Sequence, residues 1–124
     1  MTAKIPGIEK VGNVFGTDAL YVLSKVVCMV FGEDRETNTY TLTIDLESEP
    51  PRDRYRARLE FVGVRELRIR GFGGCLTQIN GLDIVDVSER QLEGIRYRVE
   101  DYEHDSIGFM CQLAAVSAIE KVII

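Results

Sequence analysis

The chain is poor in the residues that catalytic and metal centres use most often. Its 124 residues include one histidine, His104, and three cysteines, Cys28, Cys75 and Cys111, without a CxxC spacing. A zinc site usually needs three or four nitrogen or sulfur ligands, so we expect no metal site and no cofactor. Nucleophilic catalysis needs a base beside the nucleophile, and His104 is the only histidine that could act as one. The sequence therefore predicts a protein that is not an enzyme.

One polar cluster surrounds this histidine. His104 lies between Glu103 and Asp105, and Asp101 and Ser106 are close in sequence. These residues could form a catalytic group, or their carboxylates could help to bind calcium. The acidic residues elsewhere that could join such a site are Asp45, Glu47 and Glu49. The favoured interpretation is a solvent-exposed hairpin turn over residues 102–105.

Long apolar runs and targeting segments are also missing. No stretch of 18 or more apolar residues occurs, so no transmembrane helix is expected. Residues 1–7 lack the apolar core of a signal peptide. The odd number of cysteines favours reduced, buried thiols over disulfides. These features predict a cytoplasmic protein that does not act at a membrane.

The composition is that of an acidic globular protein. The formal net charge is −5, and such a chain is repelled on average by nucleic-acid phosphates, so nucleic acid is not expected as a partner. Hydrophobic residues make up 45% and charged residues 28% of the chain, which is ordinary for a folded domain. Together with the length, this predicts one domain over residues 1–124.

Alternation of apolar and polar residues is the main structural signal, because successive side chains of a strand point to opposite faces. It predicts strands over residues 39–46, 54–62, 95–102 and 106–114, and a further strand after Gly63 that buries Val64, Leu67 and Ile69. In the strand 106–114 the predicted inward-facing residues are Ile107, Phe109, Cys111 and Leu113.

The remaining segments are less regular. Residues 20–31 are apolar at both alternating sets, which favours a central strand covered on both faces, with a helix as the alternative. Residues 116–124 are predicted to form the last strand. Helix is expected only as single turns, one beginning at Thr17 or Asp18 and one at residues 88–92 capped by Ser88. Residues 71–74 are glycine-rich and predict a flexible loop.

These elements predict a mainly β fold. About eight strands, spaced at roughly 8–12 residues and joined by tight turns, favour an antiparallel meander that forms a sandwich or an open barrel. At most one or two short helices are expected.

Arginine is concentrated at the polar positions of the predicted strands. If these strands share one sheet, the arginines form one basic face that could dock an acidic protein, because guanidinium groups bind carboxylates well. The alternative is a solvated face on which they pair with Glu60, Glu66 and Glu100. The seven arginines are Arg54, Arg56, Arg58, Arg68, Arg70, Arg96 and Arg98.

Several segments, in this order, resemble a family of small all-β bacterial proteins thought to be immunity proteins of polymorphic-toxin systems. They are FGTDA at residues 15–19, LEFVGV at 59–64, NGLDI at 80–84, IRYRVEDYE at 95–103 and IGFMC at 107–111. The resemblance spans roughly residues 14–113. It implies a protein that binds and neutralises a cognate toxin without chemistry. These segments do not identify the residues that contact the toxin.

Two other functions are compatible with the same pattern. A barrel with an open apolar interior would bind a small molecule or a lipid. The chain could also be a homo-oligomeric β protein, because the apolar segment 116–124 could form an edge strand that pairs with a second copy.

Overall fold

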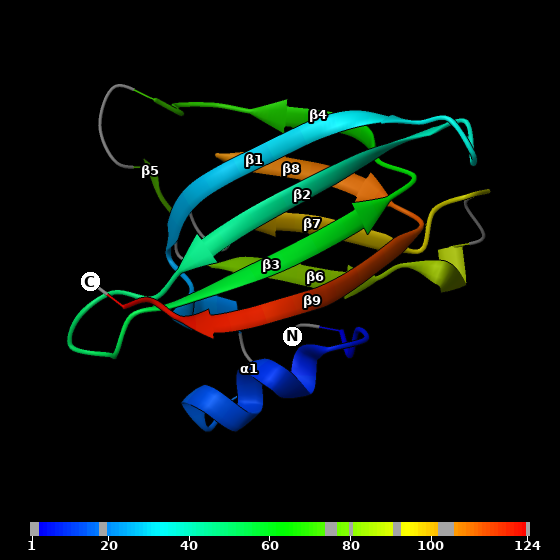
Figure 1. The fold of residues 1–124 in the computed structure, drawn as a ribbon. Coiled ribbons are helices and arrows are strands. Elements are labelled where there is room, and N and C mark those ends of the chain that lie inside the picture. Colours follow the sequence, from blue (N-terminus) through cyan, green and yellow to red (C-terminus); the bar gives the residue numbers. More distant parts are fainter. Residues whose placement is uncertain are drawn as a thin grey trace.

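Two antiparallel sheets pack face to face in the computed structural model, which describes residues 3–17, 20–73, 77–79, 81–90, 93–101 and 106–123 (Figure 1). Sheet A has the strand order β5-β1-β2-β3-β9, and sheet B has the order β4-β8-β7-β6. The strands are β1 (Lys25–Asp34), β2 (Thr39–Glu47), β3 (Tyr55–Val62), β4 (Arg65–Ile69), β5 (Thr77–Gln78), β6 (Leu82–Asp86), β7 (Tyr97–Asp101), β8 (Ile107–Cys111) and β9 (Leu113–Lys121). The predicted mainly β sandwich is confirmed, since eight of these strands have five or more residues and no barrel closes.

Two of the chain's crossings between the sheets lie at neighbouring corners. Gly63 and Val64 lead from β3 in sheet A to β4 in sheet B, and Gln112 leads from β8 back to β9. The Gln112 amide donates to the Val62 carbonyl at 2.9 Å. Gly63 has a φ of 73°, and a Cβ there would lie 2.9 Å from the Gln112 Cβ, so glycine permits this close approach. The meander therefore holds within β1-β2-β3 and within β6-β7-β8, and each set gains a fourth strand from the other half of the chain.

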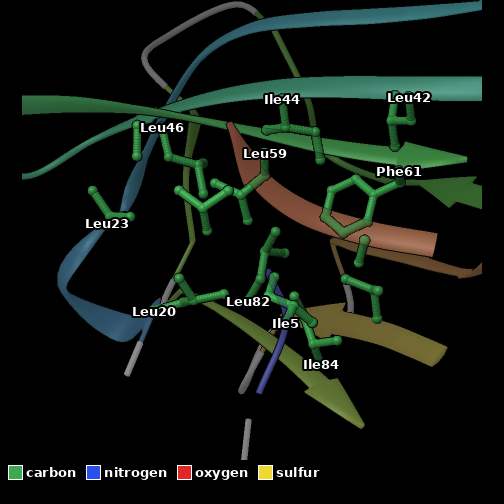
Figure 2. Packing of buried hydrophobic residues seen from close by; sticks show 14 of the residues in the cluster. Ile5, Leu20, Leu23, Leu42, Ile44, Leu46, Leu59, Phe61, Leu82 and Ile84 are labelled. Atoms are coloured by element: carbon green, nitrogen blue, oxygen red, sulfur yellow. The ribbon is translucent and has the colours of Figure 1, made fainter. Parts of the chain in front are cut away.

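The apolar residues of the alternating pattern fill the space between the sheets. Figure 2 shows Ile44 and Leu59 of sheet A pointing toward Leu82 and Ile84 of sheet B. The Phe61 and Phe109 rings join the two sheets edge to face, with centroids 4.9 Å apart. All of these side chains are almost fully buried, so the interior is a packed core, unlike the open interior of a ligand-binding barrel.

One helix, α1 (Ile8–Phe15), was not expected from the sequence. It lies beside β9 and covers one open edge of the sandwich (Figure 1). Ile8 and Val11 are buried, and the Phe15 ring contacts the Tyr55 ring edge on at 5.7 Å. The spacing of these apolar residues is helical and could have predicted the helix. Two 3₁₀ turns, η1 (Leu20–Val22) and η2 (Ser88–Arg90), complete the helical structure of the described residues.

The prediction of a central strand over residues 20–31 is wrong. Leu20, Val22 and Leu23 are buried in and after η1, and β1 begins only at Lys25. β5 pairs with just the first two residues of β1, so the rest of β1 is an edge. Val30 and Phe31 are 58% and 48% exposed. The continuous apolar pattern of residues 20–31 therefore comes from two different elements. The first part is a buried turn, and the second part is an edge strand.

Leu113 is also wrongly assigned to the core, since it is 55% exposed. The chain changes sheets at Gln112, and the alternation therefore does not continue from β8 into β9. Ile69, at the end of edge strand β4, was also expected in the core but is 45% exposed. The cysteines differ as well, because Cys111 is buried but Cys28 is exposed, and Cys75 lies outside the described residues.

The predicted turns have mixed outcomes. Ser88 does begin a helical turn, but the capping acceptor is the Asp86 carboxylate, which accepts from the Ser88 amide at 2.9 Å. The first predicted turn begins later, at Leu20 rather than at Thr17. Residues 71–73 lie outside the strands, as expected. Asp18, Gly74, residues 91–92 and the turn 102–105 with His104 lie outside the described residues.

A last strand forms, but it spans Leu113–Lys121 instead of the predicted residues 116–124, and β9 is an edge of sheet A. Part of this edge is already occupied, because the Val116 amide donates to the Pro6 carbonyl at 2.8 Å. Its pairing with a second copy stays a prediction.

Candidate partner-binding surface

The seven arginines do not form one face. Three lie on or beside β3 in sheet A, namely Arg54, Arg56 and Arg58. Four lie on or beside β4 and β7 in sheet B, namely Arg68, Arg70, Arg96 and Arg98. The prediction of one basic face is therefore wrong, because it required these strands to share a sheet. Since the inner faces of the sheets pack together, the two groups point to opposite sides of the sandwich.

The outer face of sheet A is covered by no helix in the described part of the chain (Figure 1). The strand register places Asp45 directly beside Arg58, and Glu47 beside Arg56. Arg58 donates to both carboxylate oxygens of Asp45, from Nε at 2.9 Å and from Nη2 at 3.1 Å. These hydrogen bonds, followed by the charge of Asp45, raise the pKa of Arg58. This pair has the bidentate geometry of a strong ion pair.

Glu47 is bound in a similar way. Its Oε2 lies 3.0 Å from the Nε of Arg56 and 2.9 Å from the Nη2, and its Oε1 lies 4.0 Å from the Nε of Arg54. Asp45 and Glu47 are only 3% and 5% exposed. The arginines of sheet A thus already serve as counter-ions to buried carboxylates.

Sequence reasoning missed these partners and considered Glu60 instead. A usable signal was present, because Asp45 and Glu47 share the polar set of one strand and Arg56 and Arg58 share that of the next. In a hairpin, the two sets face the same side.

Two of the arginines of sheet B form looser ion pairs. Arg96 Nε lies 3.5 Å from Asp86 Oδ2, and Arg98 Nε lies 3.5 Å from Glu100 Oε1, with all four side chains well exposed. The pKa of Asp86 is lowered, first by the Ser88 hydroxyl and amide and then by Arg96. Exposed pairs of this kind contribute about 0–1 kcal/mol to stability.

Edge strand β4 carries arginines without such partners. Arg65 is opposite Met110, Arg68 is opposite Gly108, and the Arg70 amide donates to the Ser106 carbonyl at 2.8 Å. Because Ser106, Gly108 and Met110 alternate along one strand, Arg65, Arg68 and Arg70 lie on one face. We call these three residues the β4 arginine row. All three are exposed, and within the described part of the chain their side chains make no ion pair or hydrogen bond.

Arg65 was absent from the sequence-based set for a clear reason. Strict alternation places positions 65 and 68 on opposite faces of a strand. A bulge between these residues shifts the register, and Glu66 within it has a φ of 55°. The bulge therefore moves Arg65 onto the face of Arg68 and Arg70.

Shallow hollows flank the β4 arginine row. One, of about 280 Å³, is bordered on β4 by Glu66 and Arg68 and on β7 by Arg98 and Glu100. Another, of about 380 Å³, is lined by Leu67, Arg68, Ile69 and Arg70, along β4 and just after it. Arginines of the row therefore line shallow hollows on the surface of sheet B.

The described residues give no support to the catalytic and metal sites that the sequence left open. Among the described residues, no group of three or more His, Cys, Asp or Glu could hold a metal ion. Asp101 accepts the amides of Ser106 and Ile107 at 2.9 and 3.3 Å, which is a structural role at the start of β8. Burial raises the pKa of the Cys111 thiol to about 12, so it is a poor nucleophile. None of the described helices has the length and apolar character needed to cross a membrane.

Comparison with known proteins places the chain in a family. No curated protein and no solved structure matches it. A family model described as "Immunity protein PIM8" matches residues 14–117, which include every strand of both sheets except the last residues of β9. This agrees with the resemblance found in the sequence. The chain therefore belongs to the PIM8 family of immunity proteins.

Proposed function

We propose that this protein binds a cognate toxin and neutralises it by occupying the toxin's surface. Membership of an immunity protein family implies toxin neutralisation and a toxin partner. The observation that carries the proposal is the family match over residues 14–117, since this region is the sandwich that presents both arginine-bearing outer faces.

The structure supports binding more than chemistry or ligand storage. The side chains of both outer faces are held on hydrogen-bonded strands, which give a rigid docking surface. The interior is packed around Phe61 and Phe109, and the sheets form no closed barrel. The alternative of a lipid-binding barrel therefore has no support in this fold.

We also propose that the protein acts in the cytoplasm. Cys28 is exposed and Cys111 is buried, and both are free thiols. Exposed free thiols persist in reducing compartments.

The test is co-expression with the proteins encoded by the genes beside the gene for this chain, among which we expect the toxin. We expect host cells to survive with the chain and to die without it, and the two proteins to elute together in gel filtration. Protection without a stable complex would contradict neutralisation by binding, and failure to protect would contradict the function itself. Phe61→Ala, which empties part of the core, is the control that should lose protection through unfolding.

A further inference from the structure

We propose that the β4 arginine row, Arg65, Arg68 and Arg70, is the surface that docks an acidic segment of the partner protein. The inference rests on the proposed function for the identity of this partner, the toxin. It selects one side of the sandwich, since the row lies at the edge of sheet B (Figure 1).

Available hydrogen-bond donors distinguish this row from the other arginines. Arg56 and Arg58 already bind the buried carboxylates of Glu47 and Asp45. Arg65, Arg68 and Arg70 have no such acceptors in the described residues. A guanidinium group binds a carboxylate through two parallel hydrogen bonds, so the unused donors favour an acidic ligand.

The spacing of the row fits an extended segment. Residues on one face of a strand repeat at about 7 Å, so the backbone positions of the three arginines, opposite Ser106, Gly108 and Met110, form an even series. Carboxylates at alternate positions of an extended partner segment would have the same repeat. The bulge at Glu66 interrupts the edge of β4, so recognition is expected through side chains more than through added strand hydrogen bonds.

Two glycines allow the arginines to lie against the sheet. The Arg68 guanidinium lies over Gly108, where any Cβ would collide with it. At Gly94, a Cβ would lie 3.0 Å from Arg65 Nη2. Guanidinium groups held against the backbone lose less freedom when they bind, which favours recognition.

The overall charge argues for an acidic protein ligand and against nucleic acid. The chain carries a net charge of −5, which repels a polyanion, whereas a short acidic segment meets only the local row. The row also lacks the interleaved aromatic residues on which single-stranded bases stack.

The first experiment measures binding of an inactive form of the toxin that the co-expression test identifies. We expect Arg65→Glu, Arg68→Glu and Arg70→Glu together to weaken binding about 100-fold and to reduce its salt dependence. The matched control reverses the same charge at exposed arginines outside the β4 arginine row, Arg35→Glu, Arg52→Glu and Arg90→Glu, and should change the affinity less than about threefold. Circular dichroism of both variants checks that the fold is retained.

A second variant moves one arginine without changing the charge. Gly108→Ala displaces the Arg68 guanidinium, and we expect about three- to tenfold weaker binding with unchanged thermal stability. Gly32→Ala is the control, because Gly32 also lies in a strand and a Cβ there meets nothing within 4 Å.

The outcomes separate the two proposals. If the unaltered chain does not bind the toxin domain, the proposed function fails. If it binds and the β4 variant binds equally well, or if both charge-reversed triples lose affinity equally, the β4 inference is overturned. The inference is also overturned if the variant abolishes a dimer of this chain, or binding to a DNA oligonucleotide, but leaves toxin binding intact.

Discussion

Sheet A and the β4 edge of sheet B use arginine in opposite ways. On sheet A, Arg56 and Arg58 are bound to Glu47 and Asp45, two carboxylates that are almost completely buried. On the β4 edge of sheet B, exposed arginines have no partner in the described residues. The same residue type therefore balances the charge of buried carboxylates on sheet A and is available for binding along β4.

The physical basis of this difference is burial of the acid. A buried carboxylate without a partner is costly, so an arginine beside it is required for folding. An exposed arginine is fully hydrated and costs little when it is unpaired. We therefore expect substitutions on sheet A to affect stability, and substitutions on β4 to affect binding.

The largest expected effect concerns the core that the two faces share. Phe61→Ala removes the ring that packs on Phe109 between the sheets and should lower the free energy of unfolding by about 3–5 kcal/mol. Urea denaturation followed by circular dichroism and by tyrosine fluorescence measures it. Phe31→Ala, at a half-exposed ring stacked on Tyr40, is the control and should cost about 1 kcal/mol. Two separate transitions would show that the sheets do not unfold as one unit.

The comparison itself is tested by Arg58→Ala and Arg68→Ala. The first leaves the buried Asp45 without its bidentate partner and should lower the melting temperature measurably. The second removes an arginine with no partner and should leave the melting temperature unchanged. Equal shifts measured by calorimetry would remove the distinction between the two faces.

The reactivity of the cysteines provides a chemical test of which residues lie on the surface and which lie in the core. In a Cys75→Ser background at pH 8, iodoacetamide should modify exposed Cys28 and leave Cys111 unmodified until the protein unfolds. Mass spectrometry measures both sites. Rapid modification of Cys111 in the folded protein would contradict its burial.

The same thiol predicts a loss of stability at alkaline pH. Burial raises the pKa of Cys111 from 9.0 to about 12. Between these values the unfolded chain releases the thiol proton and the folded chain keeps it, so the free energy of unfolding falls as pH rises. Cys111→Ala should remove this part of the slope in urea titrations between pH 9 and 11. An unchanged slope would mean that another group causes the loss.

The smallest effect is expected at Asp86 on sheet B. The pKa of Asp86 is lowered mainly by the Ser88 hydroxyl, which donates at 2.6 Å. The stabilisation is therefore present at neutral pH and is lost as pH falls through the lowered pKa. Ser88→Ala should raise the pKa of Asp86 in an NMR titration, whereas the exposed Ser117→Ala should not. No change in Ser88→Ala would assign the shift to the Ser88 amide and Arg96 instead.

Much of the fold could be predicted because the alternation is local. Residues 39–46 correspond to β2, and Leu42, Ile44 and Leu46 are buried as expected, whereas Tyr40 of the same apolar set is 51% exposed. The prediction fails where the phase of the alternation changes. Leu113 follows a crossing between sheets, and Arg65 precedes a bulge. No local pattern marks either event, because each depends on which strand lies alongside.

The candidate site was predictable in its chemistry but not in its arrangement. Arginines such as Arg58 and Arg68 were both assigned correctly to polar positions of strands. The neighbouring strand decides whether each arginine has a buried acid beside it. Arg58 lies beside Asp45 of β2, whereas Arg68 lies beside Gly108 of β8.

The sequence by itself determined that this is a mainly β protein and which positions of most strands face the core, because side-chain direction follows from the period of the strand. It also carried the segments that resemble an immunity protein family. Only the tertiary structure decided that β3 and β4 belong to different sheets, so that the arginines divide between two opposite faces. Strand partners and sheet crossings arise from contacts between distant residues, and these contacts settle which arginines are neutralised and which remain available.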